Sequence, residues 1–125
     1  MATELLFSYG TLQLEAIQLA IIGRTVTGQP DVLSGFEQTF VEIDDASVQA
    51  LTGKSRHVIV KFTGRPSDTI PGTLLALTHD EMQRVDSYET AQYLRVSVLL
   101  QSGTRAWVYV DADHPPSDAP LAAPD

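Results

Sequence analysis

The 125-residue chain contains no cysteine, so it has no disulfide, no thiol nucleophile and no thiolate ligand for a metal. Basic residues are scarce: 8 lysines and arginines stand against 16 aspartates and glutamates, a formal net charge of −8. Such a chain lacks the basic surface needed to bind a phosphate backbone, so no nucleic-acid partner is expected. No apolar run approaches the ~20 residues that span a bilayer, so no membrane partner is expected.

The first residues, Met1 to Glu4, carry no basic charge, and the apolar run Leu5 to Phe7 is too short for a secretory signal. We therefore expect a cytoplasmic protein. What the chain does have is a hydrophobic content of 43%, enough for one domain with a real core. We expect this domain to span residues 1–111. Residues 112–125 are rich in proline, alanine and aspartate, and we expect them to form a disordered tail.

The hydrophobic pattern predicts strands mixed with two helices. Strands are expected at residues 5–8, 25–27, 57–62, 70–77, 93–100 and 106–110, with turns at 28–30, 64–68 and 101–104. Residues 32–43 are expected to form either one strand with a bend around Gly35 or two short strands. Helices are expected at 13–22, before a glycine cap at Gly23, and at 78–89. Residues 44–54 are polar and are expected to form a loop. This mixture indicates an α+β (mixed α/β) fold with a partly closed sheet.

The second predicted helix carries the most informative carboxylate, Glu89. A T-x-x-E capping box from Thr78 to Glu81 begins this helix, and Met82, Val85 and Glu89 then share one face. Burial on that face and the negative end of the helix dipole both disfavour an ionised carboxylate, so we expect the pKa of Glu89 to exceed the ~4.3 of a free glutamate. The alternative is a solvated glutamate at a helix end.

The second candidate is the turn Tyr9-Gly10-Thr11, which follows a short apolar strand. Glycine lets the backbone approach a ligand closely, and the amides at a helix start attract anions. The alternative is an ordinary tight turn. Arg95 is expected to extend toward the rim or to form a surface ion pair. The three histidines are not spaced as metal ligands, so no metal site is expected; they are His57, His79 and His114.

Several short segments, in order along residues 5–110, resemble the gamma-glutamylcyclotransferase-like family, which includes the plant avirulence-induced proteins and small bacterial homologues. They are Leu6 to Leu12, Gly35-Phe36, Pro71 to Leu77, Met82 to Tyr93 with an Asp86-x-x-Glu89 pattern, Tyr93-x-Arg95, and Ala106 to Tyr109. The chain departs from the family at 44–56, where members often carry an aromatic segment beside the leaving-group side of the pocket.

The resemblance implies a small mixed β-barrel with flanking helices. It implies that Tyr9, Gly10, Thr11 and Leu12 bind the α-carboxylate end of a gamma-glutamyl substrate; Tyr93 is counted with them as substrate-binding. It implies that Glu89 transfers protons while the α-amine of the substrate attacks its own γ-carbonyl, releasing 5-oxoproline without a cofactor. Two other hypotheses stay open: a non-enzymatic module of the same fold that binds a metabolite or protein, and an interaction domain with a solvated Glu89.

Overall fold

The computed structural model describes residues 3–42, 56–89 and 92–113. The strands are β1 Thr3–Ser8, β2 Gln29–Ser34, β3 Phe36–Glu42, β4 Arg56–Phe62, β5 Thr69–Thr78, β6 Tyr93–Leu99 and β7 Arg105–Asp111. The helices are the 3-10 helix η1 Thr11–Gln13 and the α-helices α1 Glu15–Ile21 and α3 His79–Tyr88. The predicted mixed α+β class is confirmed.

The described strands form two sheets. Five strands join in the order β2-β5-β1-β7-β6, and β3 pairs with β4 in a two-stranded sheet. The larger sheet is mixed, since β1 runs antiparallel to β5 and parallel to β7. It curls so far that the turn after β6 reaches β2, where the Gln101 N–H donates to the Val32 carbonyl at 2.9 Å. The expected barrel therefore exists only as this curled sheet, because β4 joins no ladder of the larger sheet.

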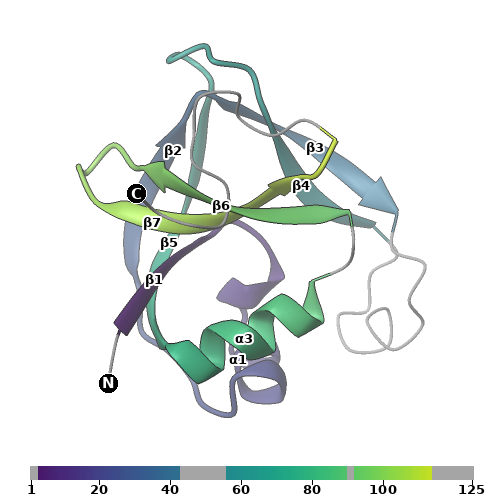
Figure 1. Cartoon of the computed structure of the whole chain (residues 1–125), viewed down its shortest axis with the longest axis vertical. Helices are drawn as coiled ribbons and strands as arrows, with labels where there is room; N and C mark the ends of the chain where they lie inside the picture. Colours follow the sequence, from purple (N-terminus) through teal and green to yellow (C-terminus); the bar gives the residue numbers. More distant parts are fainter. Residues whose placement is uncertain (1–2, 43–55, 90–91, 114–125) are drawn as a thin grey trace.

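Apolar side chains gather in two clusters on opposite faces of the larger sheet. The cluster between the two sheets includes Phe7, Leu33, Phe36, Val60, Val96 and Val108. The cluster under the helices includes Leu6, Ile17, Ile22, Met82 and Val85. Figure 1 shows α1 and α3 lying together against the sheet. Since neighbouring residues of a strand point to opposite faces, Leu6 and Phe7 place β1 between the two clusters. The end of β1 is thus a rigid position from which to start a binding loop.

The helix α3 begins at the predicted capping box. The Glu81 N–H donates to Thr78 Oγ1 at 3.1 Å, and the Thr78 N–H donates to the Glu81 carboxylate at 2.9 Å. Arg24 lies 2.7 Å from the same carboxylate and holds the pKa of Glu81 down to about 2. At the other end the backbone turns extended at Glu89, whose N–H donates to the Val85 carbonyl at 3.0 Å. Both ends of α3 are therefore fixed.

Two of the predicted elements differ in the structure. The strand expected at 25–27 is wrong: the Val26 N–H donates to the Gln18 side chain, and β2 begins only at Gln29. Gly28 and Pro30 were expected in a turn, but Gly28 passes so close to β5 that a Cβ there would lie 2.2 Å from Thr73. Proline 30 is tolerated in β2 because β2 is an edge strand.

The helix expected over 13–22 is divided in the structure. A short turn, η1, comes first; Leu14 is extended and half exposed, and α1 starts at Glu15. The apolar side of α1 is therefore carried by Ile17 and Ile22 rather than by Leu14. The predicted loop at 44–54 and the tail from residue 114 lie outside the described residues. Within the described part, neither α-helix has the length and apolar character needed to cross a membrane.

Candidate functional site

A pocket opens where the chain leaves β1. It is lined by residues 6–12 and by Val58, Glu89, Tyr93 and Tyr109. Its empty space, counted to the open mouth and therefore including open solvent, is about 430 Å³. All six residues predicted for the site line this pocket, although they come from three separate parts of the sequence: Tyr9, Gly10, Thr11, Leu12, Glu89 and Tyr93. The structure thus brings the predicted residues together, and their roles remain predictions.

The loop from Ser8 to Leu12 is held from behind by glutamine side chains. Gln18 is buried, donates to the Leu12 carbonyl at 3.0 Å and accepts from the Val26 N–H at 2.8 Å. Gln13 donates to the Gly10 carbonyl at 3.2 Å and accepts from the Thr73 hydroxyl at 2.8 Å. These contacts use the carbonyl groups of the loop. The first N–H groups of a helical turn have no partner within the helix, so the amides at the start of η1 are left for other acceptors.

Gly10 lines the pocket without adopting a backbone that only glycine favours. Its φ is −126°, in the extended range that other residues adopt. A Cβ at this position would lie 3.5 Å from Val58 Cγ2, an ordinary contact. Because Val58 also lines the pocket, a side chain at position 10 would narrow the space available to a ligand. The prediction for this glycine is that a ligand can come close to the backbone. Its place in the pocket lining is compatible with that prediction.

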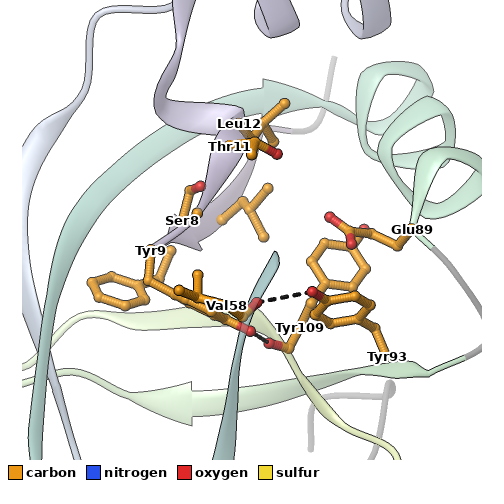
Figure 2. A pocket seen from close by; sticks show the side chains of 11 residues that line it. Ser8, Tyr9, Thr11, Leu12, Val58, Glu89, Tyr93 and Tyr109 are labelled. Carbon is orange, nitrogen blue, oxygen red and sulfur yellow. Dashed lines mark hydrogen bonds between the residues drawn. The ribbon is translucent and has the colours of Figure 1, made fainter. Parts of the chain in front are cut away.

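Glu89 enters the pocket directly after the end of α3. Figure 2 shows its carboxylate pointing into the space between Thr11 and the rings of Tyr93 and Tyr109. No hydrogen bond joins this carboxylate to another residue of the described part of the chain. Burial first, and the negative charge of Asp86 second, raise the pKa of Glu89 to about 8. The direction agrees with the expectation from sequence, but the causes include a charge that sequence reasoning had not considered.

Two tyrosine hydroxyls tie parts of the pocket wall together, and that of Tyr93 bridges the gap between the two sheets. The Tyr93 hydroxyl donates to the Val58 carbonyl of β4 at 2.8 Å, and the Tyr9 hydroxyl donates to the Tyr109 carbonyl of β7 at 2.5 Å (Figure 2). Burial raises the pKa of the phenols of Tyr9, Tyr93 and Tyr109 above the ordinary value, so all three stay neutral donors. The Tyr93 hydroxyl therefore joins β6 to β4, and the Tyr9 hydroxyl joins the loop after β1 to β7.

Behind Glu89 lies an ion pair whose acidic partner the sequence did not identify. Arg95 Nε is 2.9 Å from Asp86 Oδ1, and its guanidinium lies 4.4 Å from the centre of the Trp107 ring. The Tyr109 hydroxyl donates to the same Asp86 at 2.5 Å. Arg95 was expected at the rim or in a surface pair; it is only about a fifth exposed. The three-residue spacing of Asp86 and Glu89 is the signal that sequence reasoning had available.

Metal ligation finds no support in the described part of the chain, where no group of three or more histidine, aspartate or glutamate side chains is placed to hold an ion. His79 forms a surface pair with Glu4 at 2.8 Å. The side chain of His57, and all of His114, lie outside the described residues. Among the described residues, the polar groups that line the pocket are the Glu89 carboxylate, the loop backbone and the hydroxyls of Ser8, Thr11 and the tyrosines.

Comparison with known proteins agrees with the fold. The profile of the family described as "Gamma-glutamyl cyclotransferase, AIG2-like" matches residues 6–124. No curated protein matches the chain. A solution structure of an Arabidopsis thaliana protein superposes with a TM-score of 0.67 at 16% identity, covering 100% of this chain and 70% of that one.

Two further solved structures share the fold. A gamma-glutamyl cyclotransferase superposes with a TM-score of 0.66 at 15% identity, covering 89% of this chain and 68% of that one. The crystal structure of an uncharacterized Homo sapiens protein has a TM-score of 0.66 at 17% identity, covering 95% of this chain and 70% of that one. At these identities the likeness establishes the fold alone.

Proposed function

The chain belongs to the gamma-glutamyl cyclotransferase, AIG2-like family, and we propose that it cleaves a gamma-glutamyl amide or peptide, releasing 5-oxoproline and a free amine. The observation that carries the proposal is Glu89: a carboxylate with a pKa raised to about 8 that faces a pocket lined by the loop after β1 and by tyrosines. Such a carboxylate disfavours the folded state when ionised, a cost that a purely structural role does not explain.

The reaction needs no nucleophile from the protein. The α-nitrogen of the substrate forms a bond to the γ-carbon, and the bond from that carbon to the leaving nitrogen breaks. The α-ammonium gives up two protons in becoming a lactam N–H, and the leaving nitrogen gains two in becoming an ammonium. The pocket supplies orientation by holding the substrate folded, and the acid-base group supplies a route for the protons.

Glu89 is suited to this proton transfer. Ionised, it accepts a proton from the α-ammonium; protonated, it delivers that proton to the leaving nitrogen. Because its pKa lies near that of an amine, neither transfer is steeply uphill. In this proposal the amides at the start of η1 bind the α-carboxylate of the substrate, and Tyr93 helps to form the opposite wall.

The test is incubation with a panel of gamma-glutamyl amines and gamma-glutamyl amino acids, with 5-oxoproline measured directly. We expect release from at least one compound, at a rate reduced by a factor of about 10² or more in Glu89→Gln, which keeps shape but cannot carry the proton. Glu15→Gln, the same change at an exposed site on α1, serves as the control and keeps full activity. Binding of the panel without any release would instead favour a non-enzymatic binding module.

A further inference from the structure

Asp86 is the closest charged companion of Glu89 on α3. The two carboxylates are three residues apart, and residues at this spacing on a helix are neighbours. Glu89 caps α3 with its N–H bonded to the Val85 carbonyl, so it continues the helical path one turn past Asp86. The charge of Asp86 is accordingly the second cause, after burial, of the raised pKa of Glu89. An acidic neighbour placed here opposes ionisation of Glu89.

Arg95 and Tyr109 hold Asp86 in one orientation. Arg95 reaches both carboxylate oxygens, with Nε 2.9 Å from Oδ1 and a terminal nitrogen 3.0 Å from Oδ2. The guanidinium is in turn stacked on Trp107, and such a two-pronged, stacked arginine is a rigid partner. Tyr109 lines the pocket and donates its hydroxyl to Oδ1, so it connects the pocket wall to Asp86.

Few other charges act on Glu89 within the described chain. The titratable groups around Glu89 are Tyr88 and Asp86 of α3, Tyr9 after β1, Tyr93 of β6 and Tyr109 of β7. Two further charges act on these neighbours: Arg95 of β6 on Asp86, and Asp111 of β7 on Tyr9. The tyrosines are neutral at physiological pH, because burial raises each of their pKa values. Among the described residues, Asp86 is therefore the charged side chain that raises the proton affinity of Glu89.

We propose that Asp86 is a positioning residue for the acid-base group: its negative charge, held in place by Arg95 and Tyr109, adds to burial in opposing ionisation of Glu89, and Arg95 limits that effect by partial neutralisation. The inference deepens the proposed function and rests on it for its meaning in catalysis. Together with burial, the group formed by Asp86, Arg95 and Tyr109 behind the pocket then sets the pH at which Glu89 changes from acid to base.

The experiment is a titration of the Glu89 carboxyl carbon by NMR in wild type, Asp86→Asn and Arg95→Gln. In Asp86→Asn we expect the midpoint to fall by on the order of one pH unit, because a repulsive charge is lost and Arg95 is left uncompensated. In Arg95→Gln we expect a smaller rise, because the charge of Asp86 is then unopposed. Arg95→Lys keeps the positive charge but loses the two-pronged contact and the stacking on Trp107, so we expect its midpoint to lie between those of wild type and Arg95→Gln.

Opposite shifts distinguish the proposal from a structural role. If the ion pair only fastened α3, each broken pair would loosen the site, admit water and lower the Glu89 midpoint in both variants. Equal downward shifts, or an unchanged midpoint in Asp86→Asn, would overturn the proposal. If Asp86→Asn does not fold, a comparison of the Glu89 midpoint in Arg95→Gln with that in Arg95→Lys still tests the direction of the shift. The titration needs no substrate, so an absence of 5-oxoproline release would count against the proposed function and leave this result standing.

Discussion

At the scale of single residues, the site depends on one partly buried carboxylate. Folding disfavours the ionised form of Glu89, since its pKa of about 8 exceeds the unfolded value of about 4.5. The sign follows from the bound protons: the folded state binds more of them, so the contribution of Glu89 to stability declines as pH rises between these two values. The same property gives the residue a proton to exchange near neutral pH.

Gly10 offers a test of the pocket at this scale. In Gly10→Ala the added methyl meets Val58 at an ordinary distance and the backbone conformation is permitted, so we expect the fold to be kept. The methyl occupies space beside a bound ligand, so we expect affinity for a gamma-glutamyl compound to fall about tenfold, and further in Gly10→Val. Calorimetry in a Glu89→Gln background measures binding without turnover. A folded Gly10→Ala protein with undiminished affinity would show that ligands do not approach this turn.

At the scale of elements, the binding loop is positioned by what lies behind it. Buried Gln18 joins the loop to the segment after α1, and Tyr88 at the end of α3 shares a hydrogen bond of 3.0 Å with Thr11. The last turn of α3 therefore contacts the loop directly and presents Glu89 beside it. The Thr11–Tyr88 hydrogen bond thus links the loop directly to the helix that presents Glu89.

Gln18→Met tests this linkage. Methionine keeps a similar shape but leaves the Leu12 carbonyl and the Val26 N–H without their partner, each at a cost of about 1–3 kcal/mol. We expect the free energy of unfolding in urea to fall by roughly 2 kcal/mol or more. Gln83→Met, on the exposed side of α3, is the control and should change it by less than about 0.5 kcal/mol. A Gln18→Met protein as stable as this control would show that the loop is held by other contacts.

At the scale of the whole molecule, the sequence predicted most of the fold because its signals were local. The capping box at Thr78, the alternation in β6 and β7, and the Gly35 bend between β2 and β3 each lie within a few residues of what they determine. The strand expected at 25–27 was wrong because Val26 bonds to a distant side chain, Gln18, which no local pattern reveals.

The site was likewise predictable where the signals were local. Glu89 and the turn at Gly10 stand out from their own neighbourhoods, and the family resemblance joined them before any geometry was known. Val58 and Tyr109 were not found as pocket residues, because their place depends on how β4 meets the larger sheet. The pair of Asp86 with Arg95 was missed for a similar reason: β6 brings the arginine over the end of α3, a tertiary contact.

The measurement that tests the central claim most directly is the pH dependence of kcat/KM for 5-oxoproline release. This quantity reports ionisations of the free enzyme and free substrate, so the titration of the substrate amine is measured separately and removed. If Glu89 must start ionised to accept the α-ammonium proton, kcat/KM rises with pH through one ionisation whose midpoint lies near 8, the pKa of that carboxyl. A corrected profile that is flat from pH 6 to 9, or that reaches its plateau by about pH 5 as for an ordinary glutamate, would contradict the assignment of Glu89.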